Sequence, residues 1–245
     1  MNKIFEPIKT ELKPKLNNIL AALHKAEYER ISAHLELVEL PLGWKLSKVG
    51  DRVKYIHFPV SGIVSLIYDL EDGSSSETAI VGNEGMVGIC IFMGGDSMPS
   101  STEVQCAGYA YRLSRKFLQD EFALGGQLQQ ICLLYTLALI AQTSQTAVCN
   151  QHHLLEQKLC RLLLMIIDRV HENKVDITHE LLAKLLGVRR SSVTDAAGKL
   201  QKDEIITYTR GCITALDRPK LEMRVCECYA VITNKYEHLL PFVKN

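Results

Sequence analysis

Residues 176–217, DITHELLAKLLGVRRSSVTDAAGKLQKDEIITYTRGCITALD, contain two helical patterns followed by two β-branched runs. The leucines of residues 181–186 recur at the three- and four-residue spacing that lines one face of a helix. Thr178 can accept a hydrogen bond from a free N–H of the first turn, and Gly187 can adopt the left-handed conformation that ends a helix. The stretch therefore predicts a helix, a tight turn, a second helix and a short two-stranded ribbon.

The second predicted helix has two unlike faces. At about 100° per residue, one narrow apolar stripe is formed by Val193, Ala196, Ala197 and Leu200. The opposite side carries Ser191, Thr194, Asp195, Gly198, Lys199 and Lys202. Because small hydrogen-bonding groups dominate this face, it can enter a DNA groove and approach base edges without steric conflict.

Two arginines stand at the start of this helix. Arg189 and Arg190 oppose the helix macrodipole there, which costs roughly 0.3 to 1 kcal/mol each. A docked phosphate offsets that cost, because the free N–H groups, the dipole and both guanidinium groups act on the same anion. Residues 184–202 hold five basic residues and one acidic residue, net +4, in a chain whose formal charge is +0. This pattern indicates a nucleic-acid partner.

The β-branched runs at residues 205–208 and 212–216 predict a hairpin joined across Thr209, Arg210 and Gly211, with Arg210 at its tip. Two helices followed by such a ribbon make a winged helix-turn-helix. We therefore expect double-stranded DNA as the partner, with Arg210 within reach of a backbone phosphate. The alternative is a winged module that contacts another protein.

The remainder of the chain predicts an α+β protein. Short β-type runs separated by turn residues fill residues 37–113, which is typical of an antiparallel sandwich, roll or barrel. A supporting helix is predicted over residues 154–170 and a terminal helix over residues 219–236. Residues 1–16 predict a loosely held arm.

A long helix is predicted from residue 127 to about residue 150. Its apolar stripe has nearly heptad spacing and consists of Ile131, Leu134, Tyr135, Ala138, Ala141, Gln145 and Val148. We expect this stripe to form a parallel homodimer. Burial of the stripe against the β-rich domain is the alternative.

Composition favours a soluble protein in a reducing compartment. The 245 residues are 47% hydrophobic and 23% charged, and no apolar run approaches the roughly 20 residues that span a bilayer. The N-terminus has no apolar signal segment, so we expect a cytoplasmic location and no membrane partner. Eight cysteines are scattered, mostly in apolar segments, which suits reduced, buried thiols.

Metal and catalytic chemistry are both disfavoured by the spacing of reactive residues. Cys149 and His153, four residues apart, make only half a metal site, and Cys226 and Cys228 lack a second pair. We therefore expect these side chains to serve packing, with no metal and no cofactor. Nucleophile-elbow, Walker, zincin and dinucleotide motifs do not occur, so an enzyme is not expected.

The order of these elements resembles the Crp/Fnr family of bacterial transcription regulators, over about residues 35–229. The most specific segments are FPVSGIVSL at 58–66, QTAVCNQHHLLEQKLCRLLL at 145–164 and LLGVRRSSVTDAAGKL at 185–200. The resemblance implies a β-roll sensor domain at 1–124, a dimerisation helix at 125–150 and a winged helix-turn-helix domain at 151–245.

It also implies a homodimer whose second helices lie in successive major grooves of a two-fold symmetric site. By position, base edges are read by Arg190, Ser191, Thr194 and Asp195, while Arg189 and Arg210 contact the backbone. Thr178, Ser192 and Lys199 complete the expected DNA contacts. RNA polymerase is a further expected partner if the protein activates transcription.

The sensor half departs from the cyclic-nucleotide-binding members. Where those members have a glutamate for the ribose and an arginine for the phosphate, this chain has Ile89 and Ser100. No Arg or Lys occurs between Asp72 and Tyr111, so cyclic AMP is not expected. An iron–sulfur cluster is also disfavoured, because the family holds it mainly with N-terminal cysteines and the first cysteine here is Cys90.

An unidentified small-molecule effector is expected instead. Its predicted pocket comprises Gly82, Asn83, Glu84, Gly85, Ser100, Ser101 and Thr102. The alternative function is a small-molecule- or redox-sensing protein whose winged module contacts another protein.

Overall fold

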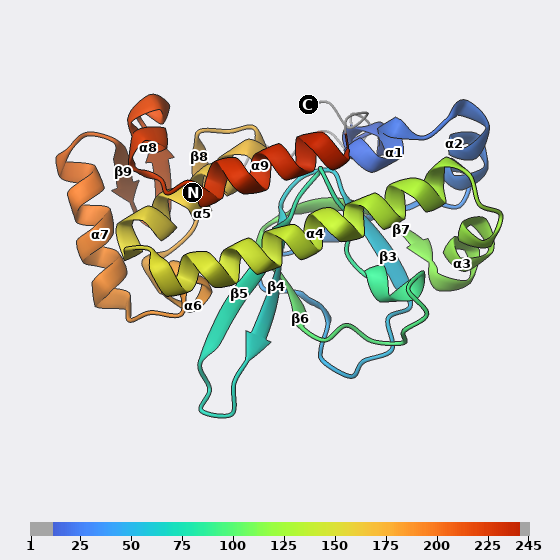
Figure 1. Cartoon of the computed structure of the whole chain (residues 1–245), viewed down its shortest axis with the longest axis horizontal. Helices are drawn as coiled ribbons and strands as arrows, with labels where there is room; N and C mark the ends of the chain where they lie inside the picture. Colours follow the sequence, from blue (N-terminus) through green and yellow to red (C-terminus); the bar gives the residue numbers. More distant parts are fainter. Residues whose placement is uncertain (1–11, 241–245) are drawn as a thin grey trace.

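The computed structural model describes residues 12–240 (Figure 1). Its N-terminal part comprises a 3₁₀ turn at Pro14–Leu16, α1 (Asn18–Ala22), α2 (Lys25–Ser32), β1 (Glu36–Leu40), β2 (Lys45–Ser47), β3 (Tyr55–Pro59), β4 (Ile63–Asp69), β5 (Ser75–Val81), a 3₁₀ turn at Ile89–Ile91, β6 (Ser101–Cys106), β7 (Gly108–Ser114) and α3 (Arg115–Ala123). The remaining elements are α4 (Gln127–His152), α5 (Leu155–Val170), β8 (Lys174–Asp176), α6 (His179–Leu186), α7 (Arg190–Lys202), β9 (Ile206–Thr209), β10 (Cys212–Ala215), α8 (Arg218–Arg224) and α9 (Cys228–Leu239).

Seven antiparallel strands form the predicted β-roll. One sheet has the order β1-β7-β3 and the other the order β2-β6-β4-β5. The two turns that precede β4 and β7 press against each other, and glycine makes this possible. A Cβ on Gly108 would lie 2.4 Å from the carbonyl of Ser61, and one on Gly62 would lie 2.5 Å from the carbonyl oxygen of Cys106.

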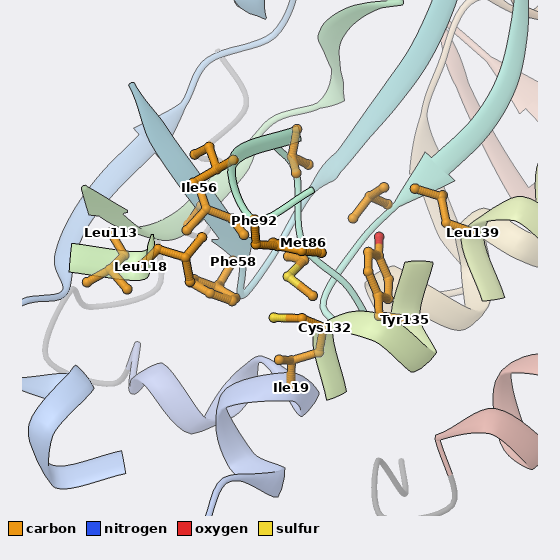
Figure 2. Close-up of a cluster of buried hydrophobic side chains, with 14 of the residues drawn as sticks. Ile19, Ile56, Phe58, Met86, Phe92, Leu113, Leu118, Cys132, Tyr135 and Leu139 are labelled. Atoms are coloured by element: carbon orange, nitrogen blue, oxygen red, sulfur yellow. The ribbon is translucent and has the colours of Figure 1, made fainter. Parts of the chain in front are cut away.

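The first hydrophobic core lies between the roll and the helices α1, α2 and α4. Figure 2 shows Cys132 and Tyr135 projecting from α4 toward Met86 and Phe58 of the roll. Tyr135 is fully buried, and a Cβ on Gly85 would lie 2.5 Å from its hydroxyl oxygen. Glycine at this position therefore lets the long helix approach the turn that follows β5.

The long helix α4 is buried on sides that the heptad pattern assigned to a partner. Ile131, Tyr135 and Ala138 have no exposed surface, because the roll and α9 cover them. Leu134, Ala141 and Gln145 are partly buried, and of the predicted stripe only Val148 is exposed, at 48%. A different line of apolar residues faces outward, formed by Leu133, Leu137 and Ile140 together with Val148.

Length and composition alone would let α4 span a bilayer, and within residues 12–240 it is the one helix that passes this test. Its position accounts for that composition. The helix runs between the roll and α9, which lies along it in Figure 1. A helix covered on two sides needs apolar residues on more than one face.

The second core joins α5 to the winged helix-turn-helix elements and to three isoleucines of the roll. A small sheet of order β8-β10-β9 completes this part of the protein. The strand β8 was not predicted, because three residues are too short to show an alternating pattern. It is specified by tertiary pairing, in which Val175 lies opposite Ile213.

The predicted terminal helix over residues 219–236 is two helices. The chain breaks at Val225, which is extended, and α9 begins at Cys228. Of the predicted N-terminal arm, residues 1–11 lie outside the described residues, and Tyr111 Oη donates a hydrogen bond to the carbonyl of Leu12 (2.6 Å).

Candidate nucleic-acid interface

The helix-turn-helix geometry follows from two residues at the ends of α6. Thr178 Oγ1 accepts a hydrogen bond from the N–H of Leu181 at 3.1 Å, so the predicted cap is confirmed. Gly187 has a φ of +63°, and its N–H donates to the carbonyls of Ala183 and Lys184. This left-handed residue ends α6 and lets α7 begin three residues later.

The two predicted faces of α7 are present. Val193, Ala196, Ala197 and Leu200 are buried against the second core. The opposite face is exposed and consists of Ser191, Thr194, Asp195, Gly198, Lys199 and Lys202, while Ser192 is half-buried between the two faces. Since α7 lies at one end of the molecule in Figure 1, this face is open to a large partner.

The N-terminus of α7 has no capping side chain. Arg189 occupies the N-cap position without a side-chain cap bond, and Arg190 is the first helical residue. Both are exposed. In the part of the chain that the structure describes, neither arginine forms an ion pair, and the same holds for Lys199, Lys202 and Arg210.

One cation of the predicted basic patch is used inside the protein. Lys184 Nζ lies 3.1 Å from Oε2 of Glu103, so α6 is joined to β6 of the roll by an ion pair. Lys45 approaches the same carboxylate at 3.9 Å. Lys184 is therefore neutralised by Glu103 of the roll and is not available to bind an anionic ligand.

The wing is a two-residue hairpin. Thr209 pairs with Cys212, and Arg210 and Gly211 have φ values of +51° and +83°. Two successive residues with positive φ are typical of a type I′ turn, whose twist matches the strands that it joins. Arg210 is exposed at the tip, as predicted. Thr178 lies beside this turn, since a Cβ on Gly211 would be 3.4 Å from its methyl group.

His179 was not among the predicted site residues, yet it links α6, α7 and the wing. Its Nδ1 lies 3.1 Å from Oγ1 of Thr194, and its ring stacks on Tyr208 with centroids 3.9 Å apart. Burial, and then the charge of Arg190, lower the pKa of His179. Thr194 is 15 residues away in sequence, and no local pattern signals such a pair.

The same contacts change the expected role of Thr194. Its hydroxyl donates to the carbonyl oxygen of Arg190 at 3.1 Å, so His179 Nδ1 is the donor in the bond to Thr194. The hydroxyl is thus engaged within the protein. Its methyl group is the part suited to a base contact, since apolar groups pack on the methyl of thymine.

The predicted effector residues do not share one pocket. Asn83 and Glu84 line a cleft of about 510 Å³ between the roll and the C-terminal helices, whereas Thr102 lines a separate cleft of about 380 Å³ in the roll. Glu84 Oε1 accepts from Nε of Arg169 at 2.7 Å, and its Oε2 accepts from the N–H of Gly82. Asn83 contacts His171.

Residues 100–102 of the predicted pocket are also engaged within the protein. Ser100, Ser101 and Thr102 are buried. Thr102 shares a hydrogen bond with Ser47 at 2.8 Å, and Ser101 Oγ donates to Asp69 at 3.4 Å. Ser101 and Thr102 lie in β6, a central strand flanked by β2 and β4, so their side chains reach residues of neighbouring strands.

The Cys149–His153 pair and the Cys226–Cys228 pair, which were expected to serve packing, lie together. The thiols of Cys149, Cys226 and Cys228 and the imidazole of His153 bring one ligand atom each, all within 4.8 Å of one another. Each pair of residues makes half a metal site in sequence, and the fold brings the two halves together.

Residues 157–224 match the Crp-like helix-turn-helix domain. The fold is similar to that of FixK2 from Bradyrhizobium japonicum, at 14% identity over 78% of this chain and 98% of that chain, with a TM-score of 0.68. It is also similar to the c-di-GMP-responsive global regulator CLP of Xanthomonas campestris (17% identity; 78% and 99% covered; TM-score 0.64) and to a CRP-family transcriptional regulator of Thermus thermophilus, TTHB099 (16%; 76% and 95%; 0.64). A comparison with curated proteins found no matching sequence.

A β-roll, a long helix and a winged helix-turn-helix occur in the same order in these solved transcription regulators. The matched domain supports the expected resemblance over residues 157–224, and the fold of the chain is similar to that of solved regulators of the CRP family.

Proposed function

We propose that this protein binds a specific double-stranded DNA sequence as a homodimer and regulates transcription from it. The observation that carries the proposal is the start of α7. Arg189 and Arg190 are exposed and have no ion-pair partner among the described residues, and the helix N-terminus beside them has no capping side chain. A backbone phosphate supplies the anion that this arrangement favours.

The exposed face of α7 supplies the reading surface. Arg190, Ser191 and Asp195 offer hydrogen-bonding groups to base edges, and Thr194 offers its methyl group. Arg189, Lys199 and Arg210 contact backbone phosphates, which position the protein without reading sequence. Thr178 and Ser192 border this surface, one beside the wing and the other at the edge of the buried face.

The homodimer forms through the outward line of α4. Ser144 and Val148 extend the exposed line. Leu133, Leu137 and Ile140 are 50–55% exposed and are spaced by four and three residues. This is the heptad spacing of a two-stranded contact. Two copies of α7 then address half-sites about one DNA turn, roughly 34 Å, apart.

The roles of the three parts of the chain follow from the proposed DNA-binding dimer. Residues 1–124 act as the sensor, 125–150 as the dimerisation helix and 151–245 as the DNA-binding domain. The protein acts in the cytoplasm, where it contacts RNA polymerase if it activates transcription. A small molecule other than cyclic AMP is proposed as the effector.

Selection from random DNA followed by footprinting tests the proposal. We expect a two-fold symmetric footprint that Arg190→Ala abolishes, and an affinity whose logarithm falls steeply with the logarithm of salt concentration. Arg52→Ala is the control, because that side chain is 72% exposed between β2 and β3 of the roll, where it pairs with Asp96. If no duplex is preferred, the alternative of a winged module that contacts another protein replaces this proposal.

A further inference from the structure

We propose that the chain binds one structural zinc ion at a site made of Cys149, His153, Cys226 and Cys228. The site lies where α4 ends and α9 begins, outside the DNA-reading surface. It revises the expectation, formed from the separate spacings, that these residues serve packing alone.

The ligand atoms have the separations that one tetrahedral ion requires. Zinc binds sulfur at about 2.3 Å and imidazole nitrogen at about 2.0–2.1 Å, so neighbouring ligand atoms lie roughly 3.5–3.8 Å apart. Cys149 Sγ is 3.5 Å from Cys226 Sγ, and Cys228 Sγ is 3.5 Å from His153 Nδ1. All four atoms fall within 4.8 Å of one another.

The ends of two helices position the two halves of the site, Cys149 with His153 and Cys226 with Cys228. Cys149 is in the last turn of α4 and His153 is its C-cap, so a spacing of four residues places them on one side of the helix end. Cys226 and Cys228 flank Glu227, the N-cap of α9, and Cys228 is the first residue of that helix. The three cysteines are almost completely buried and form a cluster of their own.

The surrounding groups orient the histidine and supply a hydrogen-bond donor to one sulfur. His153 Nε2 lies 3.3 Å from Oε2 of Glu227, which is the carboxylate–histidine arrangement that leaves the other ring nitrogen free to bind a metal. Gln145 Nε2 donates a hydrogen bond to Cys228 Sγ at 3.1 Å.

The donor set selects zinc among the common metals. Three thiolates and one imidazole in a closed tetrahedron are typical of a structural zinc site and leave no position for substrate. Calcium and magnesium prefer oxygen ligands. When zinc binds, each cysteine thiol releases its proton to solvent and the imidazole binds through Nδ1, so no redox partner is required.

The place of the site in the fold indicates what the ion does. Only His153 and Leu154 separate α4 from α5, which leads into the DNA-binding elements. An ion held by His153 and by the start of α9 fixes the direction in which the chain leaves α4 and pins α9 along that helix. The ion is therefore a brace between the dimerisation helix and the DNA-binding domain.

Metal analysis of the full chain tests the site independently of DNA binding. Protein purified under reducing conditions is expected to contain about one zinc per chain. His153→Ala is expected to lose the ion, whereas His152→Ala, whose side chain is exposed at the neighbouring position, is expected to retain it. Refolding the wild-type chain with Co²⁺ is expected to give the thiolate charge-transfer and visible bands of a tetrahedral ion.

Glu227→Gln provides a variant that keeps all four ligands, which matters if a ligand substitution prevents folding. We expect its zinc affinity to fall by about 10- to 100-fold. The proposal is overturned if reduced wild-type protein holds no stoichiometric metal and gives no Co²⁺ spectrum. It is also overturned by equal zinc loss in His152→Ala and His153→Ala, by iron in place of zinc, or by a Cys149–Cys226 disulfide that persists in reductant.

Discussion

The ring of His179 is hydrogen-bonded to Thr194 through Nδ1, with 3.1 Å between Nδ1 and Oγ1. This bond joins the first residue of α6 to the middle of the reading surface of α7. The same ring stacks on Tyr208 of the wing. One buried side chain therefore sets the positions of α7 and the wing, the two elements of the proposed DNA interface, relative to each other.

Replacing His179 separates its two contacts. We expect His179→Ala to lower the free energy of unfolding by about 1–2 kcal/mol, because a buried hydrogen bond and an aromatic stack are both lost. His179→Phe retains the stack on Tyr208 and should recover part of that stability. Urea denaturation measures both variants.

The DNA preference of His179→Phe distinguishes a positioning role from a purely structural one. Without the bond from His179, Thr194 can turn its hydroxyl toward the groove, so base preference at the position that it contacts should relax in a selection experiment. Wild-type preference in a stably folded His179→Phe protein would contradict this role.

Gly198 offers two substitutions, one that should raise stability and one that should weaken DNA binding. A Cβ at this position meets nothing within 4 Å, and the residue is in the middle of α7 on the exposed face. Gly198→Ala should therefore raise the free energy of unfolding by about 0.5–1 kcal/mol through helix propensity. Thermal denaturation provides the measurement.

The same position tests the groove contact. Gly198→Leu keeps the helix but adds a bulky side chain between the protein and a groove, so DNA affinity should fall although the domain stays folded. Unchanged affinity in Gly198→Leu would argue that this face does not meet DNA.

The exposed leucines and isoleucine of α4, Leu133, Leu137 and Ile140, lead to a prediction about oligomeric state. Leu137→Glu should convert the dimer to a monomer, because two charged side chains would face each other in the proposed contact. Leu124→Glu is the matched control, since Leu124 is 70% exposed but lies outside α4. Sedimentation velocity distinguishes the two states.

Ile131 provides the complementary substitution. Because its side chain is fully buried within the chain, Ile131→Ala should lower the free energy of unfolding by about 2–4 kcal/mol. The folded fraction should still dimerise. Loss of the dimer without loss of stability would instead support the stripe predicted from the heptad pattern.

The buried imidazole of His57 should make the free energy of unfolding depend on pH. Burial, and then the charge of Arg112, lower the pKa of His57 to about 4. Unfolded His57, with a pKa near 6.5, binds a proton more readily than the folded form, so stability is lost as pH falls from about 6.5 toward 4. The loss should reach about 3 kcal/mol, from a difference of roughly 2.5 pKa units.

His57→Phe isolates this contribution, because it retains an aromatic ring near Trp44 while removing the titrating group. Urea titrations of wild type and variant at about pH 7 and about pH 4.5 should show the wild type losing more stability. Equal losses would assign the acid sensitivity to other groups. His152→Phe, at an exposed histidine, should behave like wild type.

Local sequence determined the helix-turn-helix almost completely. The cap at Thr178, the stop at Gly187 and the two faces of α7 are properties of single elements, in which spacing along the chain decides direction in space. The wing followed in the same way, because a glycine between β-branched runs specifies a tight hairpin. These elements could be predicted without knowing what surrounds them.

Tertiary structure decided which face of α4 is covered and which residues from distant segments meet. The helix is apolar on several sides, so periodicity could not choose between Ile131 and Leu133; the roll and α9 made that choice by covering the face of Ile131. His179 meets Thr194, and Cys149 meets Cys226, only after helices separated in sequence pack together. Contacts of this kind depend on the packing of whole elements, and no single stretch of sequence encodes them.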